Sequence, residues 1–264
     1  MNRLLSCIPT ASIRITRVPG NTYCRYEAGV AVTRSIAPIP SSAGVPSAVA
    51  RAPRPRMALN PAVYDPAMRP DYPLSAFILA GGRSTRMGAD KAFLALNGRA
   101  MLQRVLDSAR SVTPIVHIVG DLAKFSPFAP TIADIFPGCG PLAGIHAALR
   151  STDTDLNLIL AVDLPFVPPA LLQFLTTQAD ASPAATAIVP RTAHGWQPLC
   201  ALYRRSFADL AESALRAGHY KIDALFPTTQ VRAIDEDELQ SAGFSAQLFR
   251  NLNTPQDLAA AHES

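Results

Sequence analysis

The 264-residue sequence has no apolar run long enough to cross a membrane and no cysteine pattern typical of a metal site. A membrane-spanning helix needs about 20 consecutive apolar residues, and no stretch approaches that length. The four cysteines, Cys7, Cys24, Cys139 and Cys200, lie far apart, without a CxxC motif or a Cys/His spacing suited to zinc. We therefore expect reduced thiols in a cytoplasmic protein without a membrane segment.

Acidic residues are almost absent from the first part of the chain. Residues 1–60 hold eight arginines and a single acid, Glu27. The formal net charge of the whole chain is only +4, so the remainder is mildly acidic. A mildly acidic body is not typical of a nucleic-acid-binding protein, and we predict no nucleic-acid partner.

Hydrophobic periodicity is also missing from residues 1–72, which are rich in Pro, Ala, Ser and Arg. Proline fixes φ and removes a hydrogen-bond donor, so the stretch SIAPIPSSAGVPSAVARAPRPR (35–56) is unsuited to a helix or a sheet ladder. We predict a disordered extension over residues 1–72 and a folded domain over residues 73–264. Two alternatives stay open for the extension: an organelle transit peptide, or a translation start at Met57 or Met68.

From Leu74 onward, short apolar runs alternate with amphipathic stretches, which predicts alternating strands and helices. The predicted strands cover residues 75–80, 114–120, 156–167, 185–190, 197–204 and 230–235. The predicted helices cover residues 101–110, 140–150, 168–180 and 206–218, with a last helix capped by Thr254. This order indicates a doubly wound α/β domain with a mostly parallel sheet, in which ligands bind at the carboxyl ends of the strands.

The loop after the first predicted strand, within FILAGGRSTRMGADKAFL (77–94), is rich in glycine and in basic residues. Gly81 and Gly82 follow the strand directly, where glycine permits a close backbone approach. Free backbone N–H groups beside Arg83, Arg86 and Lys91 would form a cationic nest for phosphates. The spacing excludes a Walker A loop and a GxGxxG dinucleotide fingerprint. The alternative is a plain glycine turn with solvated basic side chains.

Asp163 ends the most apolar of the predicted strands, in AVDLPF, just before Pro165. A buried carboxylate needs compensation, and Mg²⁺ binds one or two carboxylates together with phosphate oxygens. We therefore interpret Asp163 as a magnesium ligand, with helix capping as the alternative. Asp134 occupies a similar position after PTIA, and Asn253 could contact the metal or cap the last helix.

The stretch RTAHGWQPL (191–199) brings together a cation, an imidazole, an indole and an amide. That mixture suits the anion and the ring of a second ligand. It is equally typical of an ordinary hairpin loop, and both interpretations stay open.

LAGGRSTRMGADK, GPLAGI, VDLPF and NLNTPQDL, in this order, resemble the motifs of the molybdenum cofactor guanylyltransferase (MobA) family. The resemblance covers about residues 74–262 and none of the extension; the first motif alone would also suit sugar-nucleotide and cytidylyl transferases. It implies a Rossmann-like nucleotidyltransferase fold and transfer of GMP from GTP to the terminal phosphate of molybdopterin, with release of pyrophosphate. It also implies a Mg²⁺ cofactor, a cytoplasmic location and contacts with molybdoenzyme maturation proteins.

The resemblance implies roles for individual residues as well. GTP would be held by Leu79, Ala80, Gly81, Gly82, Lys91, Asp134 and Asp163, with Asp134 near the base or ribose and with Asp163 and Asn253 at the metal. Arg86, Lys91 and Asp163 would be catalytic, since the two cations would stabilise the departing pyrophosphate. The family often has an asparagine where this chain has Gly120, so that contact is missing or replaced by Asp121.

Two other functions remain open. The chain could use CTP, with molybdopterin or a sugar phosphate as the acceptor, and nucleotide preference separates that reaction from guanylyl transfer. It could instead be a non-catalytic protein that binds or delivers molybdopterin, which predicts nucleotide binding without turnover.

Overall fold

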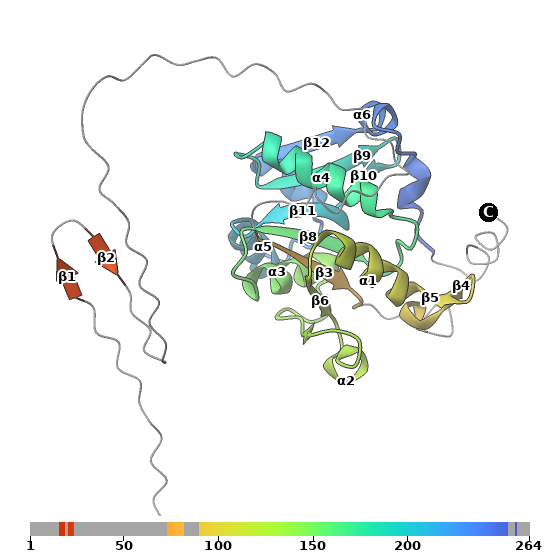
Figure 1. The fold of residues 1–264 in the computed structure, drawn as a ribbon, viewed down its shortest axis with the longest axis horizontal. Helices are drawn as coiled ribbons and strands as arrows, with labels where there is room; N and C mark the ends of the chain where they lie inside the picture. Colours follow the sequence, from red (N-terminus) through yellow and green to blue (C-terminus); the bar gives the residue numbers. More distant parts are fainter. Residues whose placement is uncertain (1–15, 19–20, 24–72, 82–89, 253–256, 258–264) are drawn as a thin grey trace, which may run out of the picture. The chain divides into compact units, whose positions relative to one another are not determined.

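The computed structural model describes residues 16–18, 21–23, 73–81, 90–252 and 257 (Figure 1). The contacts divide the chain into two units, Met1–Arg54 and Pro55–Ser264. In the first unit, β1 (Thr16–Val18) and β2 (Asn21–Tyr23) form an antiparallel pair that the composition did not predict. Their residue types include Thr, Val and Tyr, which favour strands. The rest of residues 1–72 lies outside the described part, and the domain boundary at residue 72 stays a prediction.

The second unit is built on one mixed, mostly parallel sheet in the order β10-β9-β11-β8-β3-β6-β7, with β12 paired to β9. β3 is parallel to β6 and β8, β6 to β7, and β9 to β12, whereas β11 is antiparallel to both β8 and β9. The strands are β3 (Leu74–Leu79), β6 (Ile115–Val119), β7 (Thr131–Ile132), β8 (Leu156–Ala161), β9 (Ala187–Thr192), β10 (Gly195–Trp196), β11 (Cys200–Arg204) and β12 (Val231–Asp235). The predicted mostly parallel sheet is confirmed.

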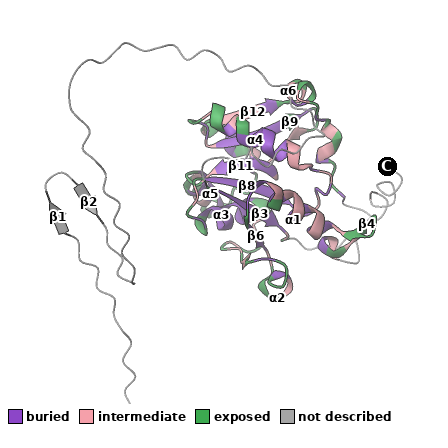
Figure 2. Ribbon diagram, in the orientation of Figure 1, coloured by how far each residue is buried: buried purple, intermediate pink, exposed green. Residues whose placement is uncertain are grey.

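Helices cover both faces of this sheet, as the doubly wound prediction requires (Figure 1). α1 (Met101–Val112), α4 (Pro169–Ala181) and α6 (Glu236–Ser241) pack on one face. α3 (Pro141–Arg150) and α5 (Phe207–Arg216) pack on the other and contact each other. Every residue of β3 and β8 is buried between these layers, as apolar central strands should be (Figure 2). Among the described helices, none is long and apolar enough to span a membrane.

The predicted strands and helices between residues 75 and 235 are all present, and most of their ends are shifted by no more than three residues. The strand predicted over residues 156–167 is shorter than expected, because β8 ends at Ala161 and Asp163 lies in the turn that follows. Several short elements were not predicted: β7, β10, α6, η2 (Lys91–Phe93), β4 (Ala95–Leu96), β5 (Arg99–Ala100), α2 (Leu122–Phe125), η3 (Asp223–Thr228) and η4 (Ala246–Phe249). The β4–β5 turn had a sequence signal, because Asn97 and Gly98 take φ values of 51° and 74°, as a two-residue hairpin turn demands. Near the C-terminus Asp257 is helical, whereas Thr254 lies outside the described residues.

The parallel strands β3, β6 and β8 bring three carboxyl ends to one edge of the sheet. Backbone hydrogen bonds continue beyond the strands, since Ala80 N–H donates to Val119 C=O (2.9 Å) and Val162 N–H donates to Leu79 C=O (3.1 Å). The chain passes from β3 to β6 on one side and later reaches β8 on the other. That reversal of strand order creates the crevice in which open α/β sheets bind ligands.

Candidate functional site

A cavity of about 880 Å³ lies at the carboxyl ends of the central strands. Part of its lining is formed by the strand ends and the residues that follow β3 and β8: Leu79, Ala80, Gly81, Val119, Ala161, Val162 and Asp163. The cavity therefore occupies the crevice that the topology creates, and it contains most of the described residues that the sequence predicted for a ligand site.

Asp163 and Lys91 form an ion pair at this cavity, with 3.7 Å between Asp163 Oδ2 and Lys91 Nζ. Their side chains are only 23% and 20% exposed. Burial raises the pKa of the Asp163 carboxyl, and the charge of Lys91 opposes that rise. The alternative role of Asp163 as a helix cap is wrong, because α4 begins at Pro169 and has no side-chain cap.

The position of Lys91 is fixed by the elements around it. Asp90 caps η2 by accepting a hydrogen bond from Ala92 N–H (3.0 Å), and it also pairs with Lys124 of α2. Phe93 of η2 stacks on Phe125 of α2, with 5.9 Å between ring centroids. η2 is thus held against α2 by both a charge pair and a ring pair.

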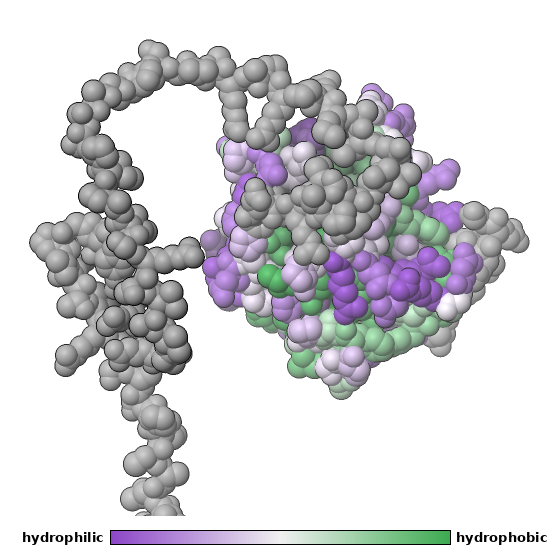
Figure 3. Space-filling model, in the orientation of Figure 1, coloured by the Kyte–Doolittle hydropathy of each residue, from purple (hydrophilic) through white to green (hydrophobic). Residues whose placement is uncertain are grey.

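Phe93, Leu122 and Phe128 remain 41%, 52% and 40% exposed around these elements. Figure 3 shows hydrophobic residues gathered low on the face in view, where Figure 1 places α2.

Three predicted site residues lie outside the described part of the chain: Gly82, Arg86 and Asn253. Their predicted contacts with phosphate and metal stay predictions. Leu252, which precedes Asn253 in the sequence, is described, and its N–H donates to Asp163 C=O (3.2 Å). The segment that leads to Asn253 is therefore bonded to the same residue that was predicted to hold the metal.

Asp134 lines the cavity and carries one acceptor atom that no described residue bonds. Its Oδ1 atom is buried and has no hydrogen-bond partner among the described residues. A Cβ atom built on Gly81 would lie 3.7 Å from Asp134 Oδ2, and one on Gly144 would lie 3.8 Å from Oδ1. Burial raises the pKa of this carboxyl. An unpaired buried acceptor costs about 1–3 kcal/mol, so a ligand that donates a hydrogen bond here would be favoured.

The first turn of α3 and the loop before it form another wall of the cavity, through Pro141 and Gly144 of the helix and Gly138 and Gly140 of the loop. Gly138 and Gly140 have φ values of 82° and 75°, which residues with a Cβ rarely adopt. No side chain caps the helix, so its N-terminal N–H groups and positive dipole favour an anion at this wall. The sequence analysis missed Gly144, although a glycine inside a helical pattern is itself a signal of close packing.

The structure gives Asp121 a role outside the cavity. Its side chain is exposed and caps α2 by accepting a hydrogen bond from Lys124 N–H (3.2 Å). A Cβ atom on Gly120 would lie 3.1 Å from two ring atoms of Phe125. The Phe125 ring thus fills the space that a larger side chain at position 120 would need, and Asp121 caps α2 and does not line the cavity.

Residues 191–199 form a hairpin, as the simpler interpretation proposed. β9 and β10 pair antiparallel, and Arg191 Nε donates to Asp235 Oδ1 (2.7 Å). The Arg191 guanidinium also lies 5.1 Å from the centre of the Trp196 ring, and Gln197 Nε2 donates to the Thr192 hydroxyl (3.2 Å). These polar groups serve the hairpin itself, while Leu199 at its end lines the cavity.

The side chains at the cavity suit a metal ion that is bound together with a phosphate ligand. In the described part of the chain, no three acidic, histidine or cysteine residues are placed to form a closed metal site. Asp163 offers one carboxylate inside a cavity that also contains a cation and a helix N-terminus. Mg²⁺ typically takes one or two carboxylates and completes its shell with phosphate oxygens and water, so Asp163 fits such an ion.

Comparison with known proteins agrees with this geometry. The family described as the MobA-like NTP transferase domain matches residues 76–232. A molybdenum cofactor guanylyltransferase from Desulfosudis oleivorans is 35% identical over 71% of this chain and 94% of the relative. The crystal structure of molybdopterin-guanine dinucleotide biosynthesis protein A from Archaeoglobus fulgidus is 29% identical, with a TM-score of 0.62 over 72% of this chain and 97% of that chain.

Proposed function

The chain belongs to the MobA-like NTP transferase family, and we propose that it transfers GMP from GTP to the terminal phosphate of molybdopterin, with release of pyrophosphate. The main support is the cavity at the carboxyl ends of β3, β6 and β8. It combines the Lys91–Asp163 pair with an Asp134 oxygen that no described residue bonds. The names of relatives that align over nearly their whole length supply the substrate pair.

Nucleotide binding follows from the walls of the cavity. The backbone at Leu79, Ala80 and Gly81 allows a close approach, because Gly81 has no side chain to block it. The N-terminal turn of α3 attracts negative charge. Asp134 accepts a hydrogen bond from the base or the ribose, and Lys91, with Gly82 and Arg86, contacts the phosphates.

The chemistry requires positioning more than covalent catalysis. A terminal phosphate oxygen of molybdopterin forms a bond to the α-phosphorus of GTP, while the bond from that phosphorus to the oxygen bridging the β-phosphate breaks. Pyrophosphate leaves with the electron pair of the broken bond. The attacking phosphate is already ionised, so no general base is needed. The protein holds the two anions in line and stabilises the developing charge with Lys91 and Arg86.

We propose that Asp163 holds Mg²⁺ and that Asn253 is a second ligand. The ion would neutralise charge on the transferred phosphate. Asp163 is suited to the role because it is partly buried, lies next to Lys91 and is bonded through its backbone to the segment before Asn253. A cytoplasmic location, contacts with molybdoenzyme maturation proteins and the lack of nucleic-acid and membrane partners stay predictions.

Pyrophosphate release tests this function. The full chain is incubated with Mg²⁺ and molybdopterin carrying molybdenum, and each of the four NTPs is offered in turn. We expect turnover with GTP alone, and a loss of roughly 10²–10³-fold in kcat for Asp163→Asn. Turnover with CTP would instead assign the cytidylyl reaction, which the absence of an asparagine at Gly120 leaves open. Nucleotide binding without turnover would favour the delivery function.

A further inference from the structure

The loop of residues 133–140 forms the wall of the cavity that contains Asp134, Gly138 and Gly140. It runs from the end of β7 to the start of α3, and Ile135, Pro137 and Gly138 are exposed. Two glycines at positive φ give such a loop more conformations to lose when it becomes ordered. The hydrogen bond from Cys139 N–H to Phe136 C=O (3.3 Å) closes one turn within it.

Phe136 and Cys139 of this loop pack on the core cluster that includes residues of α3 and α5, and Phe136 contributes the larger side chain. The His146 ring of α3 meets the Phe136 ring edge-on, with 5.2 Å between centroids and 68° between planes. The Arg216 guanidinium of α5 lies 5.6 Å from the centre of the same ring. The aromatic ring is thus held by one contact from each helix, and both kinds of contact are attractive.

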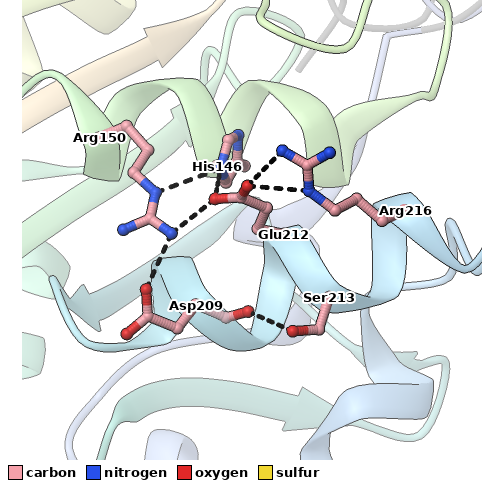
Figure 4. Close-up of polar contacts among 6 residues, drawn as sticks. All are labelled: His146, Arg150, Asp209, Glu212, Ser213 and Arg216. Atoms are coloured by element: carbon pink, nitrogen blue, oxygen red, sulfur yellow. Dashed lines mark hydrogen bonds and ion pairs between the residues drawn. The ribbon is translucent and has the colours of Figure 1, made fainter.

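Glu212 joins the two residues that hold Phe136 (Figure 4). Its Oε1 accepts from Arg216 Nε (2.9 Å) and Nη2 (2.7 Å), while Oε2 lies 3.3 Å from His146 Nε2 and accepts from Arg150 Nη2 (2.6 Å). Figure 4 shows Glu212 reaching from α5 between Arg150 and Arg216, beside His146 on α3. These hydrogen bonds hold the pKa of Glu212 down at about 2, so the carboxylate is ionised at neutral pH.

From this geometry we infer that Phe136 is a positioning residue for the nucleotide: its ring, held by His146 and Arg216, fixes the loop that carries Asp134 to the cavity. The inference rests on the proposed function, because it assumes that the nucleotide occupies this cavity. Phe136 does not line the cavity. It acts through Asp134, Gly138 and Gly140, so losing its ring should weaken nucleotide binding and leave the chemical step nearly unchanged.

The test compares KM and kcat for GTP in Phe136→Ala, Phe136→Tyr and Phe207→Leu. Ordering the backbone of one residue costs about a factor of ten in an equilibrium, so we expect KM to rise roughly tenfold in Phe136→Ala, with kcat within about twofold of wild type. Phe136→Tyr retains the ring and should keep the wild-type KM. Phe207 belongs to the same core cluster but packs on Tyr203 (4.9 Å), so Phe207→Leu should lower the melting temperature without raising KM.

Hydrogen exchange and a double mutant add two further measurements. The backbone N–H groups of residues 134–140 other than Pro137 should exchange faster in Phe136→Ala. The double mutant Phe136→Ala/Glu212→Gln should raise KM by less than the product of the two single-mutant factors, because both changes disturb the same set of contacts.

A wild-type KM in Phe136→Ala, or an equal rise in Phe207→Leu, would overturn the inference while the wild-type enzyme still supports the proposed function. A wild-type protein that neither binds nor turns over any nucleotide would overturn both.

Discussion

Asp134→Asn should stabilise the ligand-free protein while weakening its binding of nucleotide. The Oδ1 atom of Asp134 is buried without a partner in the described part of the chain, and burial raises the pKa of its carboxyl. Asparagine occupies nearly the same volume and carries no charge. The gain comes from removing a partly buried charge, since the oxygen of asparagine is still an acceptor, and we expect about 1 kcal/mol. For a domain of this size that corresponds to a rise in Tm of about 2–4 °C.

The stability that Asp134→Asn gains over the wild-type protein should increase as the pH rises. A carboxyl whose pKa is raised in the folded state binds more protons when folded than when unfolded, so wild-type stability falls as pH rises from the unfolded value through the folded one. The cost is fully present above the folded pKa and absent below the ordinary value of 3.8. The Tm difference between Asp134→Asn and wild type should therefore be largest at neutral and alkaline pH and should shrink as the pH approaches 4.

Scanning calorimetry without nucleotide and titration with a non-hydrolysable GTP analogue measure the two effects. Asparagine keeps an acceptor and loses the charge, so the hydrogen bond should weaken by about 1–1.5 kcal/mol and the dissociation constant should rise roughly tenfold in the variant. Asp107→Asn is the control, because Asp107 is paired with Arg99 on the surface of α1. A ligand-free Asp134→Asn protein that is less stable than wild type at pH 7 would refute the reasoning, as would unchanged binding of the analogue.

Three further predictions concern the surroundings of the site. Gly120→Ala should cost about 1–3 kcal/mol of unfolding free energy by crowding Phe125, and Phe125→Leu should recover part of that loss; denaturant titration measures both. Lys91→Met should lower kcat/KM for GTP by roughly 100-fold and raise the pKa of Asp163 further, visible by NMR titration. Glu212→Gln should lower Tm at pH 7, and because the folded pKa of Glu212 lies well below its ordinary 4.5, that difference should persist down to about pH 4.5 and shrink only at lower pH.

Much of the fold could be predicted from the sequence, because buried elements leave a local pattern of apolar residues. β3 and β8 are apolar at nearly every position since helices cover both faces of the sheet, and their runs predicted central strands. The antiparallel direction of β11 was not accessible, because strand direction depends on how the chain returns through the hairpin at residues 191–199.

Some features of the candidate site could likewise be predicted from the sequence, whereas others could not. Asp134 and Asp163 could be predicted because each follows an apolar run that ends at the sheet edge. The surroundings of the Asp134 carboxylate could not be predicted, since its neighbours Gly81 and Gly144 come from two other segments. The contacts that hold Phe136 join α3 to α5, and His146 and Glu212 are 66 residues apart, so no local pattern indicates them.

The most direct test of the proposed reaction follows labelled phosphorus from GTP into products. The full chain is supplied with Mg²⁺, molybdopterin carrying molybdenum, and GTP labelled at either the α- or the γ-phosphate. Attack at the α-phosphorus predicts that the α label enters a guanine dinucleotide of the cofactor and that the γ label appears only in pyrophosphate. A γ label in inorganic phosphate or on molybdopterin, or an α label that remains in free nucleotide, would contradict guanylyl transfer by this cavity.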